Sequence, residues 1–113
     1  MAYYLVTARP RADQLNDLTA QLGEAAFVDL RPFGQSLTKG LLGARWQSEG
    51  VAIWEEEDYC SPPLAMERAA VLDAYFDDIQ VERVERDEGW QRIQDLPRIF
   101  PKVADGATDS VGV

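Results

Sequence analysis

The sequence predicts one α+β domain in which two helices cover one face of an antiparallel sheet. Three observations carry this prediction. The length of 113 residues suits a single domain. Segments rich in β-branched and aromatic residues alternate with segments of helical period, and a β-hairpin is clearly marked around Gly50. We expect the domain to span residues 1–101 and residues 102–113 to form a flexible C-terminal tail, because the tail contains little to bury.

The chain begins with a predicted strand followed by a helix. Residues 3–8 are β-branched and aromatic, and they stop before Pro10, whose ring pushes the preceding residue out of helical space. Residues 11–22 place three leucines on one helical stripe, namely Leu15, Leu18 and Leu22. Gly23 then marks the expected end of that helix.

The next two segments are predicted from their proline and glycine residues. Residues 26–33 carry Phe27, Val28 and Leu30 and break at Pro32 and Gly34, which favours a short or edge strand. Residues 34–43 hold three glycines among small polar residues, and this composition predicts a long loop.

A hairpin and a second helix follow. Residues 44–47 and 51–57 read as two strands joined by a tight turn at Gly50. Ser61 is a candidate N-cap, and Pro62 suits the first helical position, so we expect a helix from there to about Phe76.

The chain is predicted to end with a strand and a short helix. Residues 79–82 alternate in polarity, and the alternation changes phase at Val84. Residues 90–96 place Trp90, Ile93 and Leu96 on one apolar edge.

This element order is that of a ferredoxin-like βαββαβ sandwich. In that plan we expect residues 3–8 and 51–57 to be parallel neighbours at the sheet centre. Arg9 and Arg11 would then approach the acidic run at residues 55–58.

Apolar side chains alternate onto both faces of these two central strands. Two helices cover only one face, so the other needs a different cover. We expect a homodimer that packs sheet to sheet and buries Trp46 and Trp54. The alternative left open is that the 34–43 loop covers the second face.

A family resemblance rests on a few residues and on the element order. The order resembles the dimeric α+β barrel superfamily, whose members include cofactor-independent monooxygenases and isomerases. The second half also resembles the darcynin-like proteins, through residues 51–55 (Val-Ala-Ile-Trp-Glu), Asp58, Tyr75-Phe76, Val81 and Gly89-Trp90. The resemblance implies a ferredoxin-like dimer and names no site residue.

Charge excludes two classes of partner. The net charge is -9, and the whole excess lies in residues 51–113, which hold fifteen acidic and six basic residues. Such a surface repels phosphate backbones and anionic lipids, so we expect neither nucleic acid nor a membrane as partner. Cys60 is the only cysteine, which excludes an internal disulfide and favours a cytoplasmic location.

The absence of histidine removes the commonest catalytic and metal-binding side chain. We therefore expect no cofactor and no metal. The acidic run at residues 55–58 is interpreted as a solvated strand end paired with Arg9, Arg11 or Arg45; Ca²⁺ binding there ranks third among the functional hypotheses. Cys60 is interpreted as a small half-buried residue.

The aromatic residues suggest a binding site for a small apolar or aromatic ligand, with an arginine as its polar anchor. The first hypothesis is a non-enzymatic ligand-binding or protein-binding domain. The candidate ligand-binding residues are Arg9, Arg45, Trp46, Trp54, Glu55, Glu57 and Tyr75. The alternative is a cofactor-independent oxygenase or isomerase that uses Glu55, Glu57 or Asp58 with Arg9, Arg45 and a tyrosine.

Overall fold

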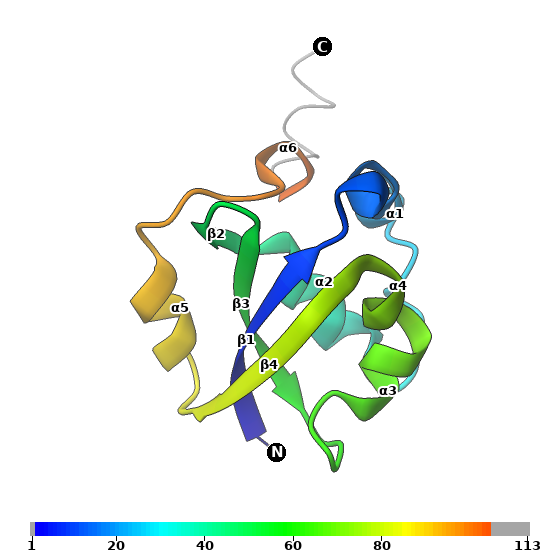
Figure 1. Ribbon diagram of the computed structural model, residues 1–113. Coiled ribbons are helices and arrows are strands. Elements are labelled where there is room, and N and C mark those ends of the chain that lie inside the picture. Colours follow the sequence, from blue (N-terminus) through cyan, green and yellow to red (C-terminus); the bar gives the residue numbers. More distant parts are fainter. Residues whose placement is uncertain (1, 105–113) are drawn as a thin grey trace.

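The computed structural model describes residues 2–104 and shows an α+β fold around one four-stranded antiparallel sheet (Figure 1). The strand order is β2-β3-β1-β4. The strands are β1 (Ala2–Pro10), β2 (Arg45–Ser48), β3 (Val51–Asp58) and β4 (Phe76–Val84). The predicted strands at residues 3–8, 44–47, 51–57 and 79–82 are therefore present, and those at both ends of the chain are longer than predicted.

The two central strands are antiparallel, which corrects the predicted parallel pairing. Ala2 lies opposite Asp58 and Ala8 lies opposite Ala52. The reason is that β3 pairs antiparallel with both of its neighbours, so β1 and β2 share a direction and β3 opposes it. Consequently Arg9 and Arg11 lie at the far end of the sheet from the acidic run. They form ion pairs with Asp78 (3.5 Å) and Asp77 (3.1 Å) instead.

Most helices lie at the connections predicted for them. They are η1 (Ala12–Gln14), α1 (Leu15–Gly23), α2 (Gly34–Leu42), α3 (Ala65–Glu67), η2 (Arg68–Leu72), α4 (Asp73–Tyr75), α5 (Glu88–Ile93) and α6 (Pro101–Ala104). The elements α3, η2 and α4 are consecutive and form one helix over residues 65–75, whose middle turn is a π-helix. This helix begins later than predicted, because Ser61 and Pro62 stay in the preceding loop.

Two predictions between α1 and β2 were wrong. Residues 26–33 form turns without a strand, and residues 34–43 contain the helix α2 in place of a loop. The glycines of this segment allow close packing: a Cβ at Gly34 would lie 2.3 Å from the Phe27 carbonyl oxygen. A Cβ at Gly40 would lie 2.8 Å from Cδ1 of Trp54. Glycine here permits a helix to approach its neighbours, which composition alone does not reveal.

The main core lies between the sheet and the helices α1, α2 and the 65–75 helix. Val6 and Trp54 from the sheet, and Leu18, Leu37 and Leu72 from the helices, are all completely buried. The Trp54 ring packs against Phe76 with 5.2 Å between ring centroids. Trp54 thus belongs to the helix-covered face, and it is not available to a dimer contact.

The second face of the sheet is covered by the chain itself. Leu5, Ile53 and Val84 on this face form a small cluster with Ile93 of α5, and Trp90 and Leu96 pack against it. The 34–43 segment packs in the main core, so it is not this cover. The sheet-to-sheet dimer stays a prediction, but burial of this face no longer requires one.

The C-terminal part of the described chain also packs on the body. Phe100 is buried, and Val103 of α6 packs against the main core. The predicted tail beyond Ala104 lies outside the described residues. Among residues 2–104, no helix has both the length and the apolar composition needed to cross a bilayer.

Candidate functional site

Three carboxyl groups and a thiol meet where the end of β3 adjoins the 65–75 helix. We call Glu56, Asp58, Cys60 and Glu67 the carboxyl cluster. Glu56 lies two residues after Trp54 on the strand, and it shares the helix-facing side of the sheet. Glu67 lies between Leu64 and Val71 at helical spacing, so it points inward with them. Their side chains are buried for the same geometric reason as their apolar neighbours.

The groups of the carboxyl cluster are tied to the backbone and to one another. Oδ2 of Asp58 accepts hydrogen bonds from the backbone N–H groups of Cys60 (3.1 Å) and Leu64 (2.7 Å). The Cys60 thiol donates to Oε1 of Glu67 at 3.7 Å. Nε1 of Trp54 donates to Oε1 of Glu56 at 2.9 Å. The loop after β3 is therefore folded around Asp58, a contact that also holds the start of the 65–75 helix.

Burial dominates the ionisation of the two glutamates of the carboxyl cluster. It raises the pKa of Glu56 well above its usual range, and the neighbouring Glu67 carboxyl adds to this effect. Burial also raises the pKa of Glu67, with Asp58 adding to it. For Asp58, burial works in the same direction, but hydrogen bonds from Glu67, Leu64 and Cys60 outweigh it and lower the pKa. Proton affinity is thus highest on the two glutamates, and Asp58 retains the negative charge.

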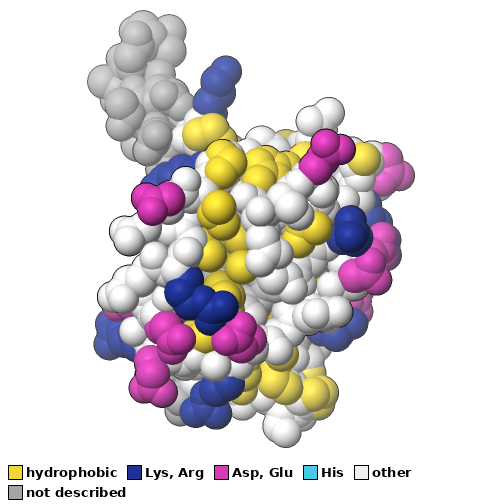
Figure 2. Space-filling view, turned by 60° about the vertical axis from the view of Figure 1, so that its left-hand side comes forward, with side chains coloured by type: hydrophobic (Ala, Val, Ile, Leu, Met, Phe, Trp, Pro, Cys, Tyr) yellow, Lys and Arg dark blue, Asp and Glu magenta, His cyan; other side chains and the backbone are white. Residues whose placement is uncertain are grey.

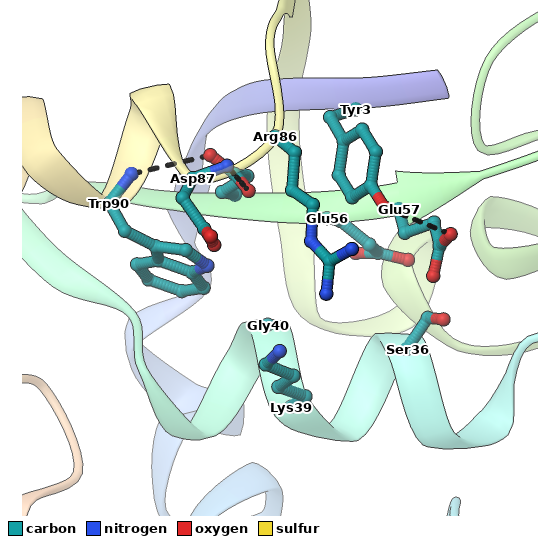
Figure 3. Close-up of a pocket in the computed structure, with 10 residues that line it drawn as sticks. Tyr3, Ser36, Lys39, Gly40, Glu56, Glu57, Arg86, Asp87 and Trp90 are labelled. Atoms are coloured by element: carbon teal, nitrogen blue, oxygen red, sulfur yellow. Dashed lines mark hydrogen bonds between the residues drawn. The ribbon is translucent and has the colours of Figure 1, made fainter. Parts of the chain in front are cut away.

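A small cavity of about 80 Å³ opens beside Glu56, between α2 and the loop before α5. Figure 3 shows α2 carrying Ser36 and Lys39 on one side, with the Arg86 side chain extending into the space from the other. Four acidic residues line it, namely Glu55, Glu56, Glu57 and Asp87. The excess of carboxyl groups and the small volume make it unsuitable for an organic anion.

Glu55 has a structural task at the start of α5. Its carboxylate accepts the backbone N–H groups of Asp87 (2.9 Å), Gly89 (2.7 Å) and Trp90 (3.3 Å). These donors lie in the first turn of α5, whose backbone has no other acceptor for them. Glu55 therefore anchors α5 to the sheet and so fixes the position of Trp90.

A larger, open cleft of about 420 Å³ lies between α2 and α5. We call it the basic cleft. It is lined by Lys39, Gly43, Arg45, Asp87, Trp90, Gln91, Gln94 and Arg98. Three basic residues therefore face one acidic residue, in a protein whose net charge is -9. This is a local reversal of the overall charge.

Tertiary pairing brings the two arginines of the basic cleft together. Arg45 and Arg98 lie opposite one another in an isolated antiparallel bridge. Backbone bonds from Trp46 to Pro97 and from Ile99 to Ala44 extend this pairing. The Arg45 side chain donates to the carbonyl oxygens of Gly43, Gln94 and Leu96. Its hydrogen bonds are to neutral acceptors, and it forms no ion pair with a carboxylate of residues 2–104.

Trp90 forms a wall of the basic cleft because Gly43 leaves room for its ring. A Cβ at Gly43 would lie 2.7 Å from Cη2 and 2.9 Å from Cζ3 of Trp90. The ring is partly buried and touches both core clusters. Because it is packed on several sides, the indole presents a fixed aromatic surface to the cleft.

An apolar groove of about 640 Å³ adjoins the hairpin turn, with Trp46, Leu96 and Pro97 among its lining residues. Figure 2 shows the side of the molecule that carries α5 and β2, where hydrophobic side chains form a band between charged ones. Trp46 is half-buried and belongs to neither core cluster.

The structure does not bring the sequence-predicted site residues into one place. Glu55 and Glu57 line the small cavity, Arg45 lines the basic cleft, and Trp46 lines the apolar groove. Arg9 is exposed beside Asp78.

The remaining two candidates are held in other contacts. Trp54 is completely buried in the core. Tyr75 donates a hydrogen bond to Asp17 at 2.6 Å. Among these candidates, Glu55 and Glu57 line the same cavity.

The interpretation of the acidic run as a solvated strand end was wrong. Glu55, Glu56 and Asp58 are 4%, 2% and 3% exposed, and none of them pairs with an arginine. Cys60 is half-buried, as predicted.

Sequence reasoning missed Glu56 and Glu67 as inward-facing residues. Two signals could have found them: the alternation through Trp54, and the helical spacing from Leu64 through Glu67 to Val71. Lys39 and Arg98 gave no such signal, because only the folded chain places them in one cleft.

Comparisons with protein-family models, with curated proteins and with solved structures give no significant match to this chain. The resemblance to the dimeric α+β barrel superfamily and to the darcynin-like proteins therefore stays a prediction.

Proposed function

We propose that the protein is a small-ligand-binding domain whose basic cleft binds an organic anion with a flat or aromatic body. The observation that carries the proposal is the convergence of Lys39, Arg45 and Arg98 around the Trp90 ring. Recognition of a ligand of this kind needs positive charge for its anionic group and an apolar surface for its body. Both are supplied by one cleft.

Charge supports an anionic ligand. The chain has 11 Lys and Arg residues against 20 Asp and Glu, yet the cleft has three basic residues and only Asp87 as an acidic one. Within the described part of the chain, Lys39 and Arg98 form no ion pair. Neither side chain is therefore committed to an ion pair, although Lys39 also borders the small cavity with its carboxylates. Anion binding would relieve the repulsion among the basic residues of the cleft.

Size and lining support a small organic molecule. The volume of about 420 Å³ falls within the range of about 300–1,000 Å³ that is usual for small-molecule sites. The indole of Trp90 offers a stacking surface, and Gln91 and Gln94 offer neutral hydrogen-bonding groups. A carboxylate or phosphate ester of an aromatic compound matches this combination.

The finer architecture is part of the same proposal. The order β2-β3-β1-β4 with antiparallel neighbours is compatible with a ferredoxin-like fold, and we adopt that fold for the domain. The catalytic alternative keeps one supporting observation: Glu56 is enclosed beside the small cavity rather than exposed. Ligand binding ranks above it because the larger cleft has the more complete recognition surface.

A panel of matched ligands tests the proposal. We expect benzoate and phenyl phosphate to raise the melting temperature and to change tryptophan fluorescence, whereas neutral benzamide should do neither. The double variant Lys39→Gln/Arg98→Gln should weaken anion binding at least about tenfold, because it removes two of the three charges. Thermal shift and fluorescence titration measure both effects.

The control is a second double variant with the same loss of charge. Arg31 and Arg83 are exposed and lie outside the basic cleft. Arg31→Gln/Arg83→Gln should bind the anions like the unmodified protein. Equal weakening in both double variants, or no binding of either anion, would refute the basic cleft as the ligand site.

A further inference from the structure

The carboxyl cluster offers four donor atoms of the kind that binds a metal ion. Ligand atoms of Asp58, Cys60 and Glu67 all lie within 4.8 Å of one another. Glu56 lies two residues before Asp58 on β3, faces the same side of the sheet and is buried like Asp58. Three carboxylates and a thiol thus come together from β3, from the following loop and from the 65–75 helix.

When the cluster is fully ionised, two of its oxygen atoms accept no hydrogen bond from the described residues. They are Oε2 of Glu56 and Oε2 of Glu67, and their side chains are 2% and 0% exposed. An unpartnered buried polar atom is costly, and adjacent carboxylates add repulsion to that cost. These atoms require either protons or a cation between them.

We propose that Glu56, Asp58, Cys60 and Glu67 form a binding site for a divalent transition metal of the zinc type. The ion would tie the end of β3 to the 65–75 helix as a structural centre. The absence of histidine led us to expect no metal, so this site differs from the prediction made from the sequence. It does not depend on ligand binding in the basic cleft.

The donor set selects the class of metal. Ca²⁺ takes six to eight oxygen ligands and Mg²⁺ retains several waters, whereas this cluster is almost entirely buried. A thiolate among carboxylates suits an ion of intermediate softness, and Zn²⁺ accepts four such ligands. Asp58, Cys60 and Glu67 supply three of them, and Glu56 on the same face of β3 is the candidate for the fourth.

Distances permit the site after a local adjustment. With Zn–S and Zn–O bonds of about 2.3 Å and 2.0–2.2 Å, tetrahedral geometry places two donor atoms about 3.3–3.7 Å apart. The ligand atoms of Asp58, Cys60 and Glu67 all lie within 4.8 Å of one another, so they need to approach by up to about 1.5 Å. Cys60 is half-buried in the loop, which leaves a side from which an ion can enter.

Proton balance follows from the chemistry of the ligands. Metal binding replaces the proton of each protonated carboxyl group and of the Cys60 thiol, so the protons are released to solvent as the metal bonds form. No electron is transferred. The bound dication then provides the charge compensation that protons provide in its absence.

Titration of the chelator-treated full-length protein with Co²⁺ and Zn²⁺ tests the proposal. We expect one Co²⁺ per chain, a visible absorption spectrum with a thiolate-to-cobalt band, displacement by Zn²⁺, and proton release in weakly buffered solution. Glu67→Gln should weaken binding by more than the about 10–100-fold that loss of an outer-shell partner costs. Cys60→Ser should abolish the thiolate band.

The control variant is Glu57→Gln, which removes a half-buried carboxylate of the same strand outside the cluster. It should bind Co²⁺ like the unmodified protein. Cys60 lies in a loop, so Cys60→Ser remains informative if Glu67→Gln does not fold, and circular dichroism reports folding for each variant. Absence of Co²⁺ and Zn²⁺ binding, or a spectrum unchanged in Cys60→Ser, would overturn the metal site and leave protons as the occupants.

Discussion

At the residue scale, burial gives three adjacent glutamates different roles. Glu55 faces α5 and accepts three backbone N–H groups, whereas Glu56 faces the opposite side and joins the carboxyl cluster. Glu57 is half-buried and accepts a hydrogen bond from the Tyr3 hydroxyl at 3.3 Å. The alternation of a strand explains why neighbours of the same type end in different environments.

Glu55→Gln tests the anchoring of α5. An amide has one acceptor oxygen, and its NH₂ group would face backbone donors, so at least one N–H group loses its partner. We expect the free energy of unfolding to fall by at least about 2 kcal/mol, because hydrogen bonds to a charged group contribute about 1.5–3 kcal/mol each. Urea denaturation measures the difference.

The control for this variant is Glu49→Gln, an equal loss of charge at the exposed hairpin turn. It should leave stability within about 0.5 kcal/mol of the unmodified protein. If Glu55→Gln were as mild as this control, the contacts of Glu55 with α5 would not contribute to stability.

The Tyr75–Asp17 hydrogen bond predicts a pH effect with a defined direction. The bond to the Asp17 carboxylate, helped by burial, raises the pKa of Tyr75 from 10.0 to about 12. A pKa raised in the folded state gives stability that is complete below the unfolded value and is lost as pH rises through the folded value. We therefore expect this contribution below pH 10 and its loss by about pH 12.

The measurement is the stability difference between the unmodified protein and Tyr75→Phe as a function of pH. The difference should shrink between pH 10 and about pH 12. In an Asp17→Asn background the same substitution should show a much smaller pH dependence. A difference that stays constant to high pH would contradict the assignment.

At the element scale, α2 depends on glycine for its position. The helix packs directly on β3, and a Cβ at Gly40 would lie 2.8 Å from Trp54 Cδ1 and 3.1 Å from the Glu55 carbonyl oxygen. Trp54 is completely buried and the carbonyl belongs to the strand, so neither can move freely. This contact also positions Lys39 at the basic cleft.

Gly40→Ala should therefore destabilise the protein by about 1–3 kcal/mol, the usual cost of overpacking a core. The matched control is Gly23→Ala, since no atom lies within 4 Å of a Cβ built at Gly23 at the end of α1. It should be neutral or stabilising by up to about 1 kcal/mol, because alanine favours helix. Thermal or urea unfolding of both variants checks the contrast.

At the scale of the whole molecule, α5 changes the expected assembly. Two helices leave one sheet face bare, which is why the sequence predicts a dimer, but Ile93, Trp90 and Leu96 cover the apolar centre of that face. A sheet-to-sheet dimer through this face would require α5 to move. The homodimer remains a prediction, and it rests on the resemblance alone.

Charge is also organised at this scale. The second half of the chain carries the acidic excess, and three of its exposed carboxylates lie on β4: Asp77, Asp78 and Glu82 pair there with Arg11, Arg9 and Arg92. The basic cleft lies between elements from both halves, α2 and α5. The acidic surface would therefore repel an approaching anion, whereas the basic cleft would attract it. This arrangement favours binding of anions in the cleft over nonspecific binding elsewhere on the surface.

Local pattern determined the parts of this protein that depend on neighbours in sequence. The hairpin around Gly50, the strand at residues 3–8 and the helix stripe of Leu15, Leu18 and Leu22 follow from periodicity and turn chemistry. Periodicity also indicates that the side chains of Glu56 and Glu67 face the core. It does not indicate that the two side chains lie close together, because that depends on how β3 packs against the 65–75 helix.

Tertiary structure alone decided the direction of the central strands, the helix at residues 34–42, the cover of the second face and the basic cleft. Each depends on contacts between distant segments. In the sequence, a glycine that allows two elements to pack closely cannot be distinguished from a glycine in a loop. Lys39, Arg45 and Arg98 become neighbours only when residues 97–99 pair with residues 44–46. The physical reason is that sequence pattern reports which side of an element is buried, whereas its partner is chosen by the packing of the whole chain.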